Sequence, residues 1–127
     1  MSAGGAGGRF WDYLAAGSIR VPRCDGCGRW TWPAQYRCGD CGSFDFSWTD
    51  VDPAGEVFAW TRTHHAFDRS LADSVPYTVV VGTLPGSGNV RLIGLLDLEA
   101  GDVEIGTPVR AAVGAADGGA RVLWKRP

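Results

Sequence analysis

The sequence is poor in the side chains that bind nucleic acid or perform acid–base catalysis. Lys125 is the only lysine, and 12 basic residues against 14 acidic ones give a net charge of −2. Because affinity for a phosphate backbone comes mainly from clustered lysine and arginine, this balance argues against a nucleic-acid-binding protein. Histidine occurs only at His64 and His65. Adjacent residues on a strand point to opposite faces, so at most one of the two can serve a given site.

The sequence also lacks a long apolar run and a signal peptide. No run approaches the roughly 20 apolar residues of a transmembrane helix, and the N-terminus has no secretion pattern. We therefore expect a soluble, cytoplasmic protein with no membrane partner. Residues 1–8 contain only Met, Ser, Ala and Gly, which predicts a disordered leader or the remnant of an excised domain. The rest can form one medium domain, or a small metal module joined to a compact domain of about 75 residues.

Cysteine is confined to two Cys-x-x-Cys pairs, Cys24 with Cys27 and Cys38 with Cys41, with ten residues between them. This spacing predicts four sulfur ligands around one Zn²⁺, each about 2.3 Å from the metal. Four thiolates leave no coordination position for water or substrate, so we expect one structural zinc ion. The alternative is two disulfides, which persist in oxidising compartments.

The N-terminal third reads as a short helix followed by a zinc ribbon. Phe10, Trp11, Tyr13 and Leu14 lie at helical spacing, and Gly17 is placed to end the helix. Two turns are too short to be stable alone, so this helix must dock on its own domain or on another chain. Residues 29–36 alternate aromatic and polar residues, which predicts a short strand and turn. We assign the helix to residues 9–20 and a rubredoxin-like zinc ribbon to residues 21–46.

The remainder has the pattern of an all-β domain. A half-buried strand is expected at 44–48, and five more at 56–63, 76–84, 90–96, 108–113 and 120–125, with a hairpin loop at 85–89. The β-branched run 79–81 predicts a strand buried on both faces. Five short strands fit an OB-fold barrel better than a sandwich of about seven. We therefore predict a mostly β protein with a five-stranded OB-fold domain over residues 47–127.

Six tryptophans are many for so small a core. Trp48 and Trp60 lie in strand patterns, and we expect them in the core. Trp11, Trp30 and Trp32 fall in the helix and the ribbon, which have little interior. They either form a partner surface, since tryptophan contributes heavily to interface hot spots, or pack the helix against the ribbon.

Several motifs in this order resemble the DUF35 family. They are the helix Phe-Trp-Asp-Tyr-Leu-x-x-Gly, the four-cysteine ribbon, Phe-x-Phe-x-Trp at 44–48, Gly-Glu-Val-Phe-x-Trp-Thr at 55–61, Val-Pro-Tyr at 75–77 and Ile-Gly-Thr-Pro-Val at 105–109. The similarity covers about residues 10–127. It implies a zinc ribbon followed by an OB-fold.

The resemblance also implies a function. Members of the DUF35 family are non-catalytic partners of thiolase-like enzymes. Some bridge a thiolase and hydroxymethylglutaryl-CoA synthase, and others activate lipid-transfer-protein-like thiolases that act as retro-aldolases in steroid side-chain degradation. By this resemblance the chain is not catalytic alone. It would join a thiolase-fold catalytic subunit acting on acyl-CoA, as a heterotetramer, fused to or associated with a hydratase-like domain.

A second candidate surface follows the strand 56–63. His64 or His65, with Phe67, could line a ligand or partner surface, and Arg69 could meet an acyl-CoA phosphate. The alternative is an ordinary polar strand end that enters a loop. Two other classes stay open: a stand-alone acyl-CoA carrier or bridging protein, and a single-stranded nucleic-acid binder that uses stacking aromatics.

Overall fold

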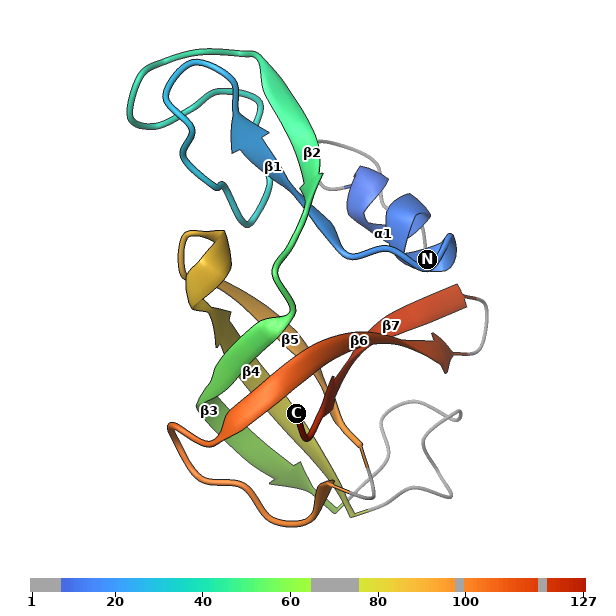
Figure 1. Ribbon diagram of the computed structural model, residues 1–127. Helices are drawn as coiled ribbons and strands as arrows, with labels where there is room; N and C mark the ends of the chain where they lie inside the picture. The colour runs from blue at the N-terminus through green and yellow to red at the C-terminus, as the bar shows by residue number, and fades with distance from the viewer. Residues whose placement is uncertain (1–7, 65–75, 98–99, 117–118) are drawn as a thin grey trace.

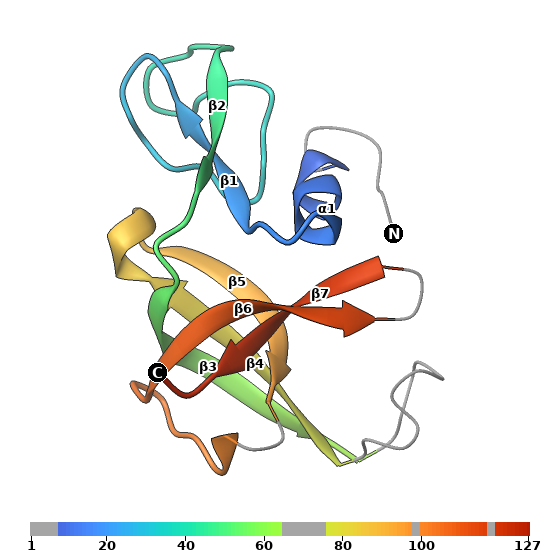
Figure 2. The same ribbon diagram turned by 45° about the vertical axis from the view of Figure 1, so that its right-hand side comes forward.

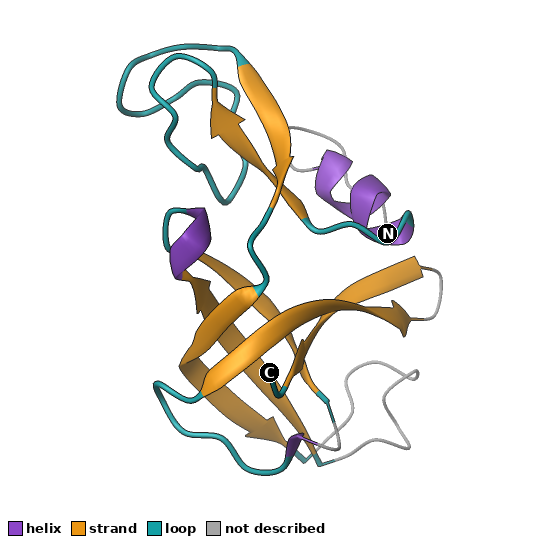
Figure 3. Ribbon diagram, in the orientation of Figure 1, coloured by secondary structure: helices purple, strands orange, loops and turns teal. Residues whose placement is uncertain are grey.

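The computed structural model describes residues 8–64, 76–97, 100–116 and 119–127. Figures 1 and 3 show a small two-stranded unit with a helix beside it, above a barrel. The elements are α1 (Gly8–Ala15), β1 (Arg20–Cys24), β2 (Phe46–Asp50), β3 (Ala54–Thr63), β4 (Tyr77–Leu84), the 3-10 turn η2 (Pro85–Ser87), β5 (Val90–Leu96), β6 (Pro108–Ala116) and β7 (Gly119–Lys125). Strands β1 and β2 form one sheet, and β3-β4-β5-β7-β6 form a closed barrel. The predicted fold class is confirmed.

Helix α1 docks on its own chain. Phe10 and Leu14 are one helical turn apart and are buried, while Trp11 lies on the exposed side. The helix contacts β1 and β7, so it bridges the ribbon and the barrel. Gly17 follows it with φ +94°, a conformation that glycine adopts without strain. No helix among the described residues is long and apolar enough to cross a membrane.

The barrel is closed by a short parallel pairing of β5 with β7, and antiparallel pairs make the rest. Trp124 on β7 is fully buried at its centre. The indole lies directly against the backbone of Gly82 on β4, where any Cβ would overlap the ring. Gly55 on β3 leaves space for the carbonyl of Thr83 and for the same ring, since a Cβ there would lie 2.7 Å from Thr83 O and 3.3 Å from Trp124 Cζ3. Two glycines therefore make room for the largest core side chain.

Two expectations about core strands were wrong. Trp60, expected in the core, is 43% exposed. Strand β3 has a bulge between Val57 and Ala59, and Trp60 beyond it lines an open hollow with Arg62 and Val103. Strand β4 is buried on one face only: Val80 is fully buried, whereas the residues on either side of it are half-buried. Trp48 packs against the core as expected, although it stays half-buried.

The ribbon rests on the loop that joins β4 to β5 (Figure 2). Trp30 of the ribbon lies against Gly88, whose φ is +71° and whose Cβ would lie 2.7 Å from the indole Cδ1. The buried Ser87 accepts a hydrogen bond from the backbone N–H of Asp52 at 2.9 Å, in the segment between β2 and β3. These contacts fix the ribbon on the barrel.

Candidate metal centre and partner surface

The four cysteine sulfurs converge at the end of the ribbon. All four Sγ atoms lie within 4.8 Å of one another, with Cys24 to Cys41 at 3.5 Å and Cys27 to Cys38 at 3.7 Å. A tetrahedral zinc–thiolate site with bonds of about 2.3 Å has sulfur–sulfur edges of about 3.8 Å. All four cysteines are free. The four cysteines are therefore suited to binding one zinc ion, as predicted, and the disulfide alternative is not formed.

The two Cys-x-x-Cys-Gly turns, at 24–28 and 38–42, are built alike, and we call them knuckles. In each, the glycine after the second cysteine donates its N–H to the carbonyl of the first cysteine, Gly28 to Cys24 at 2.9 Å and Gly42 to Cys38 at 3.0 Å. Both glycines have left-handed φ, +78° and +79°. The turn therefore needs a residue without a Cβ, and it directs backbone N–H groups toward the sulfurs.

An arginine that the sequence analysis missed supports each knuckle. Arg23 Nε donates to the carbonyl of Gly28 at 2.9 Å, and Arg37 Nε donates to that of Gly42 at 3.3 Å. The signal was present as a repeat of Arg-Cys-x-x-Cys-Gly at 23–28 and 37–42. Residues that hold metal ligands in place are a regular part of such sites.

Backbone N–H groups make two of the thiols acidic. Hydrogen bonds from the N–H groups of Cys41 and Asp40 lower the pKa of Cys38 to about 6. The N–H of Cys27 likewise lowers the pKa of Cys24. The N–H of Arg29 also acts to lower the pKa of Cys27, but burial and the neighbouring sulfurs outweigh it and raise that pKa to about 12. Four thiolates this close repel one another unless a cation lies among them. A zinc dication would supply the positive charge and would link the two cysteine pairs.

The structure brings some of the predicted surface residues together: Trp30 and Trp32 line one hollow, and Trp11 and Trp32 both contact the ring of Phe10, whereas His64 lies apart from them. Trp30 and Trp32 are half-buried and pack against the core, and the Trp32 ring lies 4.4 Å from that of Phe10, centroid to centroid. Packing of the helix against the ribbon is therefore the observed role of Trp32. Trp11 is 38% exposed. His64 is exposed and follows β3, which runs away from the ribbon (Figure 1), so it lies at the other end of the barrel.

His65, Phe67 and Arg69 lie outside the described residues. Within the described ranges His64 is the only histidine, and the four cysteines are the only group of three or more potential metal ligands. The two most exposed aromatic side chains of the described residues were missed, Tyr36 at 70% and Phe44 at 71%. Their sequence signal was weak: each stands in a loop that flanks the second cysteine pair.

The fold and the cysteine centre together define a small zinc-ribbon protein with an OB-fold barrel. The family models for ChsH2 match both parts: the rubredoxin-like zinc ribbon domain over residues 11–47 and the C-terminal OB-fold domain over residues 48–114. The second match covers more than half of the chain. The chain belongs to the ChsH2 family, which confirms the resemblance to DUF35 proteins.

Known proteins agree with this assignment. A protein of Thermomonospora curvata described as "Probable enoyl-CoA hydratase alpha subunit" is 30% identical over 102 residues. The match covers 79% of this chain but only 31% of that protein, so the chain spans about a third of the length of its curated relative. A chain of the structure described as "Ltp2-ChsH2(DUF35) aldolase" superposes with a TM-score of 0.87 at 23% identity, covering 99% of this chain and 98% of that one. A DUF35 protein from Sulfolobus solfataricus superposes with a TM-score of 0.63 at 22% identity, covering 97% and 87%.

Proposed function

We propose that this chain is a non-catalytic accessory subunit or domain that binds and activates a thiolase-fold aldolase acting on acyl-CoA thioesters. The supporting observation is the end-to-end superposition on a chain of the Ltp2-ChsH2(DUF35) aldolase, at a TM-score of 0.87. Membership of the ChsH2 family supports the same conclusion.

The chemistry of the described residues supports an accessory role over a catalytic one. Catalysis of thioester cleavage needs a nucleophile next to a base, with donors for the developing oxyanion. The four cysteines form a closed metal site, and His64 is exposed at the end of a strand. The chain's contribution is then to dock on the catalytic subunit and order its active-site loops.

The resemblance to DUF35 proteins supports a narrower assignment of the reaction and the assembly. We place the complex among the retro-aldolases that cleave a β-hydroxyacyl-CoA side chain in steroid degradation, as a heterotetramer. The curated relative is more than twice as long as this chain and is described as a probable enoyl-CoA hydratase subunit, which supports association with a hydratase-like domain. A cytoplasmic location fits free zinc-binding thiolates, because reducing compartments preserve them.

The experiment is a reconstitution of the aldolase. The thiolase-fold protein of the same organism is assayed for cleavage of a β-hydroxyacyl-CoA thioester alone, with this chain, and with this chain after zinc removal. We expect no turnover by the chain alone and full turnover only with both proteins. Turnover by the chain alone, or equal turnover by the catalytic protein with and without the chain, would refute the proposal.

A further inference from the structure

Two hollows on the ribbon share one lining residue. The first, about 500 Å³, lies between ribbon residues 28–35 and barrel residues 88–91. The second, about 300 Å³, is lined by Arg9, Pro22, Gln35, Tyr36, Phe44, Phe46 and Trp48. Gln35 lines both hollows. We call them together the ribbon surface.

The ribbon surface has the composition of a protein interface. Six aromatic residues line it: Trp30, Trp32, Tyr36, Phe44, Phe46 and Trp48. Its charged lining residues are all arginines, Arg29, Arg91 and Arg9, without aspartate, glutamate or lysine. Interface cores are enriched in aromatics and arginine and depleted of those three residue types. Arg29 is paired with Asp40, but Arg9 and Arg91 make no ion pair among the described residues, and in a chain with a net charge of −2 their positive charge favours an acidic partner.

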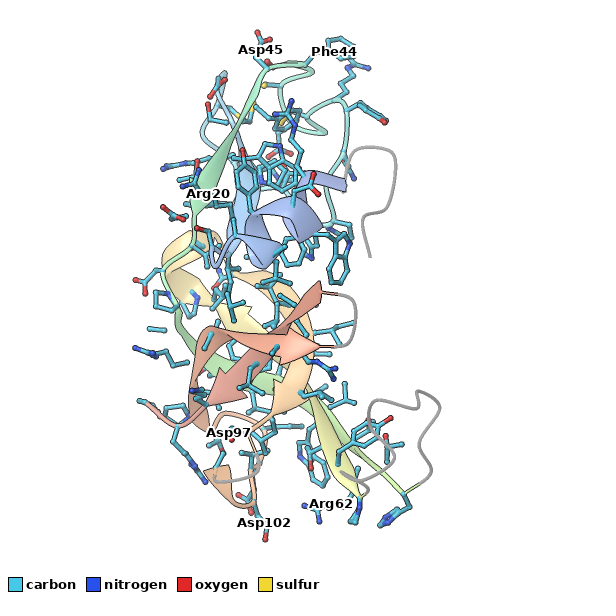
Figure 4. The ribbon with its side chains drawn as sticks, turned by 90° about the vertical axis from the view of Figure 1, so that its right-hand side faces the viewer. Arg20, Phe44, Asp45, Arg62, Asp97 and Asp102 are labelled. Carbon is cyan, nitrogen blue, oxygen red and sulfur yellow. The ribbon has the colours of Figure 1, made fainter. Side chains whose placement is uncertain are left out.

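The surface combines a fixed floor with exposed anchors. Trp32 stacks on Phe10, and Trp48 lies 5.8 Å from Tyr13 between ring centroids, so the floor is held by α1. Tyr36 and Phe44 are each about 70% exposed, and Figure 4 shows Phe44 at the tip of the ribbon, far from the barrel. Exposed rings beside a rigid hollow can anchor a partner at little cost in conformational entropy.

The polar groups of the first hollow can also take a partner. Arg29 contacts Asp40 at 2.9 Å in an exposed ion pair, which is weak enough to exchange. Thr31 is only 8% exposed, and its hydroxyl has no hydrogen-bond partner among the described residues.

We propose that the ribbon surface is where the catalytic subunit docks, through an acidic face whose apolar side chains enter the two hollows. This inference rests on the proposed function and adds the docking face and its charge. The hollows are lined by 11 and 7 residues, and a stable interface uses about 20 to 30 residues from each partner. The ribbon surface thus supplies most of an interface of ordinary size.

The test measures the affinity of the thiolase-fold protein of the same organism for variants of this chain by titration calorimetry. We expect Tyr36→Ala and Phe44→Ala each to weaken binding by about tenfold or more, the effect of a hot-spot side chain. Ile93→Ala and Ile105→Ala are matched controls, because both side chains are exposed on the barrel at 68% and 75%. These controls should change affinity by less than about twofold. Zinc content and thermal unfolding of every variant show that it is folded.

Charge reversal is the second arm of the test. Arg9→Glu and Arg91→Glu should slow association several-fold at low salt, whereas Arg110→Glu, on β6 outside both hollows, should not. If the Tyr36 and Phe44 variants bind like the unmodified chain, the docking face lies elsewhere and this inference fails while the proposed function stands. If the unmodified chain does not bind at all, both fail.

Discussion

Trp30 and Gly88 join the ribbon to the barrel. The indole lies over the backbone of a glycine in the left-handed conformation, with φ +71°, and no space remains for a side chain. Arg23 covers the Trp30 ring from the ribbon, its guanidinium carbon 5.1 Å from the ring centroid. Gly88 is therefore one of the residues that set the orientation of the metal module on the barrel.

Gly88→Ala tests this contact. The change adds left-handed strain of about 1 to 2 kcal/mol, and overlap with Trp30 of about 1 to 3 kcal/mol. Gly101→Ala is the matched control: its φ is +74°, but nothing lies within 4 Å of its added Cβ. Denaturant unfolding should show a larger loss of stability at position 88. Equal losses would mean that the Trp30 contact contributes nothing.

Removing one metal ligand should unfold the ribbon and spare much of the barrel. Zinc binding supplies much of the folding free energy of such a small module, so Cys38→Ser should lose the metal, and zinc analysis of the unmodified chain should give one ion per chain. Near-UV circular dichroism separates the two parts. Protein purified without zinc that keeps a native ribbon would contradict this prediction.

Acid should release the zinc. Only the thiolate binds the metal, so protons compete with it. The folded pKa of Cys38 lies at about 6, below its ordinary value of 9.0, so the stabilisation from its ionised form is present above pH 9 and is lost as the pH falls through 6. Zinc retention in an acid titration, followed with a chromophoric chelator, should decline as the pH falls, because protons already compete at Cys27, whose pKa is raised, and compete at Cys38 as well near pH 6. Retention unchanged well below that pH would contradict this role for the thiolate.

Arg23 and Arg37, one beside each knuckle, should raise the affinity of the site for zinc. Arg37→Met removes the hydrogen bond to the carbonyl of Gly42 and should weaken zinc binding by about tenfold, the lower range for residues that support metal ligands. Arg110→Met, in the barrel, is the control. Chelator competition measures both. Equal affinities would show that the knuckle turn holds its shape without the arginine.

Trp32 and Trp11 should differ in what they stabilise. Trp32 packs on Phe10, so Trp32→Ala should cost about 2 kcal/mol or more of folding stability. Trp11 is more exposed, and Trp11→Ala should change stability by less than about 1 kcal/mol. If Trp11 belongs to the partner surface, its loss should instead weaken the complex by about 2 kcal/mol. Thermal unfolding and titration calorimetry separate the two effects.

The parts of the fold that depend on local sequence were predictable. Cysteine spacing fixes which sulfurs can meet, and the glycines after Cys27 and Cys41 determine the knuckle turns. The number and length of the strands predicted the barrel, because five short strands can form a closed sheet in only a few arrangements. The domain boundaries at residues 20/21 and 46/47 stay a prediction.

What depends on long-range packing was not predictable. Trp60 pairs with the buried Val80 on β4, but it lies where β3 lines an open hollow with Arg62, and it stays 43% exposed. Phe44 was placed in a strand, yet β2 begins at Phe46 and leaves Phe44 exposed. Whether Trp32 faces a partner or its own chain depended on where α1 docks, and the place of Trp30 depended on how the ribbon meets Gly88. No local pattern contains either contact.

The most direct measurement of the central claim is light scattering during gel filtration of this chain mixed with the thiolase-fold protein of its own organism, in about half-molar salt, where exposed charge attraction is largely screened. The account predicts one complex of fixed stoichiometry with zinc bound, since its contacts are mainly aromatic. Separate elution of the two proteins, together with salt-sensitive binding of this chain to single-stranded DNA, would contradict it.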